Sequence, residues 1–132
     1  MLDFAAGPSP VTRRAMRGAR SYHAGLAAED QVSRHYERLG RPVAARRWRC
    51  AWGEIDLVAH DGDTTVFIEV KASSTHAEAS SHFGRRQYDR ICAASTEFVN
   101  GEPNGQLTDV RIDLALVDGL GRIEVIEGVY FD

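Results

Sequence analysis

Residues 53–71 have the sequence GEIDLVAHDGDTTVFIEVK, and this stretch decides how the sheet of the protein is built. Apolar and polar side chains alternate in its two halves, residues 54–60 and 64–71, with the two-residue period of a β-strand. Asp61-Gly62 lies between the halves and is typical of a tight hairpin turn. The stretch therefore predicts two antiparallel strands joined by a two-residue loop.

The register of this hairpin decides which side chains share a face. A loop at Asp61-Gly62 pairs His60 with Asp63, and a slip of two residues would keep the same faces together. Four polar side chains are then expected on one face: Glu54, Asp56, Glu69 and Lys71. The opposite face is expected to be core, because all its residues are apolar: Ile55, Leu57, Val66, Ile68 and Val70.

Lys71 is the one lysine of the chain, and the other 15 basic residues are arginines. Arginine has a planar, forked guanidinium group that is always charged, whereas lysine has a compact ammonium group on a flexible side chain. A lysine kept at one place, two residues after Glu69, favours a chemical role for its amine. The alternative is a strand face with ordinary ion pairs, because acids and lysines at this spacing are common on exposed strands.

Acids on two adjoining strands also suit a divalent metal. Mg²⁺ prefers oxygen ligands and keeps several waters, so one or two carboxylates and a substrate phosphate suffice. Asp56 and Glu69 are the expected carboxylate ligands, the carbonyl of Val70 could add a third oxygen, and Glu54 is a further candidate. The metal, Mg²⁺ with Mn²⁺ as a substitute, would activate a water and polarise a phosphate. Lys71 would orient that water or stabilise the negative charge that develops.

Further segments have the periodicity of regular elements. Apolar residues recur at helical spacing in residues 19–39 and 81–100. Residues 43–49 predict a strand, and a second hairpin is expected from residues 110–117 and 122–126. The order helix, three strands, helix, two strands predicts an α/β domain with a central mixed β-sheet flanked by α-helices.

The 132 residues are sufficient for one domain with its own core. We expect this domain over residues 18–132, preceded by a flexible N-terminal tail, residues 1–17, in which Gly7-Pro8-Ser9-Pro10 interrupts regular structure. No apolar run has the length of a membrane span, and no secretory signal is recognisable. Two cysteines without metal-ligand spacing fit a cytoplasmic protein with reduced thiols.

Charge is divided unequally along the chain, whose net charge is −3. Residues 1–53 contain ten arginines and four acidic residues, whereas residues 54–132 contain six basic and fifteen acidic residues. Such a division fits a phosphate-binding face beside an acidic metal centre. Scattered solvated charge explains it equally well.

Glu29 lies on the apolar stripe of the first expected helix, three residues from both Leu26 and Val32. A carboxylate on a core-facing stripe is costly unless it is paired, protonated or bound to a metal. Pairing with Arg34 or Arg38 is the simplest expectation from position alone.

Five stretches, in order along residues 18–127, carry a resemblance to a known family. The chain is similar to the YraN-like family of uncharacterised bacterial proteins, within the PD-(D/E)xK nuclease superfamily. The matching stretches are Glu29 with Tyr36-Glu37-Arg38-Leu39-Gly40, Gly53-Glu54-Ile55-Asp56-Leu57-Val58-Ala59, Val66-Phe67-Ile68-Glu69-Val70-Lys71, Arg86-Gln87 with Arg90-Ile91, and Arg111-Ile112-Asp113-Leu114. The sequence departs from the pattern at Ile55 (usually Pro), Ser73 (usually Arg) and Arg86 (usually Lys).

The resemblance implies a restriction-endonuclease-like three-layer fold and Mg²⁺-dependent hydrolysis of DNA phosphodiester bonds. By layout, the most similar active relatives are Holliday junction resolvases of the archaeal type, so branched DNA is the implied substrate class. Carried over, Asp56 and Glu69 would bind metal, and Lys71 would assist the attack. Glu29 would complete the acid cluster, and Gln87 would contact the site or the substrate.

Two classes of function remain open from the sequence. The first is a nuclease, favoured by the complete set of Asp56, Glu69 and Lys71. The second is a catalytically inactive nucleic-acid-binding or scaffold protein, which the acidic net charge favours, because phosphate contacts require a basic face. Local candidates for nucleic-acid contacts are Arg85, Arg86, Arg90 and Trp52. A homodimer would provide two active sites for a symmetric junction.

Overall fold

A computed structural model describes residues 10–132, with side chains described from residue 24 onward. The elements are α1 (Pro10–Arg38), β1 (Val43–Cys50), β2 (Gly53–Asp61), β3 (Thr64–Ala72), α2 (His76–Ser81), α3 (Arg85–Phe98), the 3₁₀ turns η1 (Val99–Gly101) and η2 (Gly105–Leu107), β4 (Asp109–Val117) and β5 (Ile123–Ile126). No helix in this part of the chain is both long enough and apolar enough to cross a membrane.

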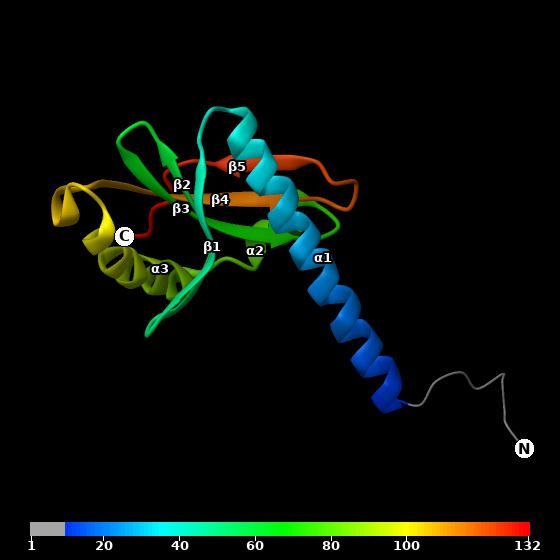
Figure 1. Ribbon diagram of the computed structural model, residues 1–132. Coiled ribbons are helices and arrows are strands. Elements are labelled where there is room, and N and C mark those ends of the chain that lie inside the picture. Colours follow the sequence, from blue (N-terminus) through cyan, green and yellow to red (C-terminus); the bar gives the residue numbers. More distant parts are fainter. Residues whose placement is uncertain (1–9) are drawn as a thin grey trace, which may run out of the picture.

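The five strands form one mixed sheet in the order β1-β2-β3-β4-β5. Neighbouring strands are antiparallel, except that β3 and β4 are parallel. The parallel pair requires a crossover, which α2 and α3 provide. Figure 1 shows α1 on one side of the sheet and α2 and α3 on the other. This is the predicted α/β arrangement, a restriction-endonuclease-like three-layer domain with a central mixed sheet.

Both faces of the sheet are buried. Under α1 the fully buried side chains come from the helix and from the three central strands: Val32, Tyr36, Leu57, Ala59, Val66, Ile68 and Ala115. Under α2 and α3 the corresponding residues are Ile55, Val58, Phe67, Ala79, Ile91 and Ala94. Because both faces of the sheet are covered, polar side chains that act chemically are expected only at the ends and edges of its strands.

The helices differ from those expected in their bounds. α1 begins at Pro10, nine residues before the helix predicted from residue 19, and proline suits a first helical position because its missing N–H needs no partner there. Residues 1–9 of the predicted tail lie outside the described residues. The helix expected over residues 81–100 is α3, which begins four residues later because Gly84 is its N-cap. The short helix α2 before it was not predicted, and Thr75 caps it by accepting the Glu78 N–H at 3.1 Å.

The register of the β2–β3 hairpin differs from the predicted one by two residues. Asp61 pairs with Thr64 and His60 with Thr65, so the two-residue loop is Gly62-Asp63. Gly62 has a φ of +61°, and only glycine adopts this conformation freely at the first loop position. Because the shift is two residues, the predicted sharing of faces in β3 is unchanged.

The predicted assignment of Ile55 to the same face as Leu57 is wrong. Ile55 packs under α2 and α3 with Phe67, whereas Leu57 packs under α1. Alternation fails between them because the β1–β2 pairing omits Arg47 and Asp56, and Arg47 has a φ of +50°. The irregularity therefore falls on Asp56, one of the predicted site residues.

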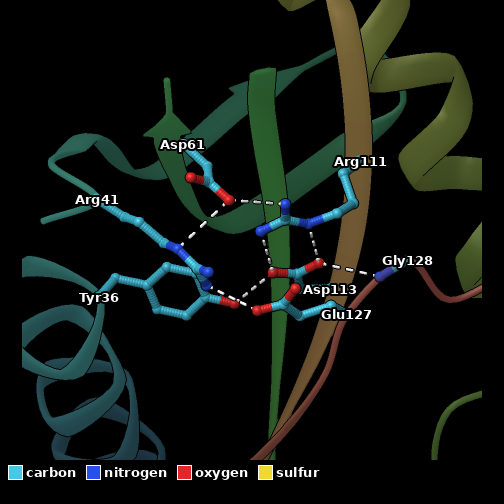
Figure 2. Close-up of polar contacts among 7 residues, drawn as sticks. All are labelled: Tyr36, Arg41, Asp61, Arg111, Asp113, Glu127 and Gly128. Carbon is cyan, nitrogen blue, oxygen red and sulfur yellow. Dashed lines mark hydrogen bonds and ion pairs between the residues drawn. The ribbon is translucent and has the colours of Figure 1, made fainter. Parts of the chain in front are cut away.

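A buried polar network attaches α1 to the sheet (Figure 2). The carboxylate of Asp113, which is fully buried, accepts from Tyr36 Oη at 2.7 Å and from Arg111 Nε at 2.9 Å. It also accepts from the Gly128 N–H at 3.2 Å, and Arg111 reaches Asp61 at 2.8 Å. Burial, followed by the bond to Asp113, raises the pKa of the Tyr36 hydroxyl. Tyr36 is thereby fixed as a donor.

Candidate active site

The site begins where the β2–β3 ladder ends. The last regular pair is Leu57 with Ile68. Beyond it, the N–H of Val70 donates to Asp56 Oδ2 at 2.8 Å. The side chain of Asp56 thus replaces a main-chain acceptor of its own strand, and this bond holds its carboxylate against β3.

Glu69 and Lys71 follow on β3, on the side of the sheet that α3 covers. Lys71 Nζ lies 3.5 Å from Glu69 Oε1. With its amide oxygen turned toward the lysine, Gln87 of α3 accepts from Lys71 Nζ at 3.0 Å and donates to the His82 carbonyl at 3.0 Å. An ammonium group has three N–H donors, and these two contacts use two of them.

Glu69 has a carboxylate oxygen with no partner. Glu69 is only 6% exposed, and its Oε2 atom is buried without any hydrogen bond from the residues that the structure describes. Buried polar atoms are almost always satisfied, so an orphaned carboxylate oxygen requires an explanation. A cation or a water bound at Oε2 would satisfy it.

Burial and mutual repulsion keep the two acids from ionising easily. Burial, followed by the charge of Glu69, raises the pKa of Asp56 to about 7, although the Val70 N–H opposes this shift. Burial also raises the pKa of Glu69, against the opposing charges of Lys71 and Arg90. Burial therefore disfavours the charged form of both carboxylates, and a bound divalent ion would favour it.

The burial of the Asp56 carboxylate predicts that Asp56→Asn stabilises the protein in the absence of metal. The amide oxygen of Asn can still accept from the Val70 N–H, while the charge that burial disfavours is gone. We expect a gain of about 1–3 kcal/mol at pH 8 in EDTA, measured by urea unfolding. Because native Asp56 takes up its proton at a higher pH than in the unfolded chain, the gain should grow from pH 4 to pH 7.

Asp63→Asn provides the control for that comparison. Asp63 is exposed in the hairpin loop, so its substitution should change the free energy of unfolding by less than about 0.5 kcal/mol. A destabilised Asp56→Asn protein at pH 8, or a gain that is independent of pH, would refute this cost of burying the Asp56 charge.

Glu29 reaches the acids from α1. It is buried, its Oε2 accepts from Arg47 Nε at 2.9 Å, and its charge contributes to the raised pKa values of Asp56 and Glu69. The structure thus brings Glu29 to the predicted acid cluster. Its partner is neither Arg34 nor Arg38, as position in the helix suggested, because Arg34 binds Asp30 and Arg47 approaches from β1.

Arg47 is a residue that the sequence did not identify. Its positive φ would cost little for glycine but of order 1 kcal/mol for other residues. We therefore expect Arg47→Gly to be more stable than Arg47→Ala by about 1 kcal/mol, the reverse of the usual order in a strand. Both variants lose the contact with Glu29, so the comparison isolates the backbone. Chemical denaturation measures it, and equal stabilities would mean that the positive φ carries no strain.

Glu54 and Arg90 stand beside the site with partners of their own. Glu54 Oε2 accepts from Arg49 Nε at 2.9 Å, so Glu54 is engaged on the β1 side of the strand. Arg90 Nη1 donates to the Glu54 carbonyl at 2.8 Å and lies where a side chain at Gly53 would be. Arg90 thus braces the start of β2 and places its positive charge near Glu69.

The other residues predicted to contact nucleic acid are exposed. Arg85 and Arg86 lie on the first turn of α3, where Arg85 has only a 3.6 Å ion pair with Asp89. Trp52 is 57% exposed in the β1–β2 turn. None of these side chains is needed to fill the core.

The donors present suit a hard divalent ion. Among the described side chains, no three His, Cys, Asp or Glu groups are placed to hold a metal together. Mg²⁺ does not require such a cage, because waters and substrate phosphate complete its shell. The orphaned Glu69 Oε2 and the adjacent Asp56 carboxylate, both oxygen donors, fit that requirement.

Comparison with known proteins places the chain among proteins of unassigned activity. Residues 28–117 match the uncharacterised protein family UPF0102. A UPF0102 protein of Cereibacter sphaeroides (strain KD131) is 58% identical over 115 residues, which cover 87% of this chain and 98% of the relative. UPF0102 proteins of Ruegeria pomeroyi and Dinoroseobacter shibae are 52% and 39% identical, over 88% and 92% of this chain and 94% and 91% of the relatives.

Proposed function

Because the chain belongs to the uncharacterised protein family UPF0102, we propose its function from the site itself: a Mg²⁺-dependent nuclease that hydrolyses phosphodiester bonds of DNA. The observation that carries the proposal is the orphaned Oε2 of Glu69, buried beside Asp56 and two residues from the one lysine. Buried carboxylates that could hold a divalent cation, next to a fixed ammonium group, suit a reaction in which negative charge accumulates on phosphate.

Asp56 and Glu69 would hold the metal, with the Val70 carbonyl as a possible further ligand. When bound, the ion would neutralise charge on the scissile phosphate and favour attack by water. Glu29 lies close enough to influence both acids and would enter the same cluster if Arg47 released it. Mn²⁺ would serve as a substitute, because it accepts the same oxygen ligands.

Lys71 would act on the reacting phosphate or water with its third N–H. Glu69 and Gln87 fix the ammonium group from two sides, so this donor has a defined direction. A donor that is already oriented stabilises developing charge without further reorganisation. Gln87 is thus a positioning residue, since the contacts described for it are to Lys71 and to a main-chain carbonyl.

DNA is the proposed polymer, and branched structures are the proposed substrate class. Exposed Arg85 and Arg86 on α3 and exposed Arg49 on β1 supply positive charge on both sides of the strand that carries Asp56. Phosphate contacts of this kind provide most of the affinity for nucleic acid. A homodimer would present two sites to a symmetric junction, and light scattering would measure that state.

The test is cleavage of labelled linear, single-stranded, flapped and four-way-junction DNAs, and of an RNA of the same sequence, in Mg²⁺, Mn²⁺ or EDTA. We expect metal-dependent cleavage, with branched DNA cut faster than linear duplex. If folded protein cleaves none of these nucleic acids with either metal, the nuclease proposal fails. Binding without cleavage would then favour a nucleic-acid-binding or scaffold protein on the same fold.

A further inference from the structure

We propose that Trp52 is a stacking platform for an unpaired base, so that the protein selects DNA with single-stranded or displaced nucleotides near the cut. The inference rests on the proposed function only for the nature of the polymer. What it adds is the feature of the DNA that this surface recognises, an unpaired base. Its argument starts from the two tryptophans of the chain, which lie four residues apart in different environments.

Trp48 and Trp52 differ in exposure. Trp48 packs edge-on against Phe98, with ring centroids 5.2 Å apart, and belongs to the core under α3. Trp52 is 57% exposed and takes no part in either core cluster. A single exposed apolar side chain needs no explanation by itself, so the argument depends on what surrounds it.

The turn that carries Trp52 is held in place. Cys50 pairs with Gly53, so Ala51 and Trp52 form a two-residue turn between β1 and β2. Gly53 has a φ of +123°, and a Cβ there would lie 2.7 Å from Arg90 Nη1. Arg90 therefore packs directly on the glycine while it donates to the next carbonyl. An aromatic ring on a braced turn loses little conformational entropy when a ligand covers it.

Exposed arginines lie on the hairpin that carries Trp52 and on α3, and Arg49 among them is paired with Glu54 at 2.9 Å. The side chain of Arg49 is 82% exposed on the same hairpin, and Arg85 and Arg86 are exposed on the first turn of α3. Figure 1 shows the β1–β2 turn extending past α3, away from the sheet. An exposed aromatic face among arginines is the combination that binds single strands, because bases stack while phosphates pair with the cations.

The ring also lies at a useful distance from the acids. Trp52 precedes Asp56 by four residues, and β2 begins at Gly53, so the two lie at most roughly 13 Å apart along the chain. At about 3.4 Å per stacked base, that distance corresponds to a few nucleotides. The base on Trp52 would therefore lie a few nucleotides from the scissile phosphate, outside the paired helix.

The test is binding without cleavage, in EDTA, by the intact chain with Trp48→Phe, which leaves Trp52 as the one tryptophan. Titration with a 20-nucleotide single strand should quench its fluorescence, and the matched fully paired duplex should quench it much less. Trp52→Ala should weaken binding of the single strand about tenfold and of the duplex less than twofold. Trp52→Phe should restore most of the affinity.

Leu107→Ala is the control, because Leu107 is 88% exposed and lies on η2. Leu107→Ala should change neither the affinity for the single strand nor the affinity for the duplex. Unchanged binding by Trp52→Ala, or equal losses on single strand and duplex, would overturn the inference even if the protein cleaves DNA. If Trp52→Ala loses affinity only for the single strand and the wild type cleaves nothing under any condition, the inference is upheld and the nuclease proposal is refuted.

Discussion

Lys71→Ala should lower the rate of metal-dependent DNA cleavage by about 10²–10³-fold. Lys71 is oriented by Glu69 at 3.5 Å and by Gln87 at 3.0 Å, and these contacts leave a third N–H that would meet the charge that develops on the phosphate. Loss of one such preorganised donor costs about this much in an acyl-transfer oxyanion hole. Single-turnover cleavage at saturating protein measures the chemical step apart from binding.

Two further variants make this prediction specific. Gln87→Ala should cost less, because the ammonium group keeps its contact with Glu69 and loses only a positioning partner. Arg122→Ala removes a 71% exposed cation at the β4–β5 loop and should leave the rate unchanged. Circular dichroism verifies that the Lys71→Ala protein is folded. If the folded variant cleaves DNA at the wild-type rate, Lys71 takes no part in the chemical step.

Asp113→Ala should destabilise the protein by about 3–5 kcal/mol, a large part of the stability of a domain this size. The substitution leaves the fully buried Tyr36 hydroxyl and the Arg111 guanidinium without their shared acceptor (Figure 2). The Gly128 N–H loses its partner as well. Urea unfolding gives the free energy, and the midpoint should fall while the slope stays the same.

The same network offers graded controls. Glu127→Ala removes only a half-exposed partner of Arg41 and should cost less than about 1 kcal/mol. Tyr36→Phe keeps the contacts of Asp113 with Arg111 and should cost about 1–2 kcal/mol. If Asp113→Ala costs no more than Glu127→Ala, the network does not hold the domain together. Tyr36 and Glu29 are seven residues apart on α1, so the network also fixes the helix that carries Glu29.

The order of helical and strand-like periods in the sequence predicted the α/β domain with a mixed sheet, and the resemblance to the YraN-like family implied its three-layer fold. The sequence also predicted that Glu69 and Lys71 lie together on β3, which holds in any register. The hairpin register was wrong by two residues. The pattern Asp-Gly suggested a loop at those two residues, whereas the chain uses Gly62 as the first loop residue, where a positive φ is needed.

The surroundings of the acids could not be predicted from local patterns. The face of Ile55 depends on the irregular backbone at Arg47, which belongs to a neighbouring strand. The partner of Glu29 is likewise set by packing of α1 on β1, not by spacing within the helix.

Titration of Mn²⁺ into metal-free wild type and Asp56→Asn protein, followed by calorimetry, tests the central claim most directly because it needs no knowledge of the substrate. The account predicts saturable binding by wild type, accompanied by a rise in thermal stability, and loss of both in Asp56→Asn although that variant is the more stable protein without metal. Binding of equal affinity in the two proteins, or none in wild type, would contradict the assignment of Asp56 and Glu69 as a metal site.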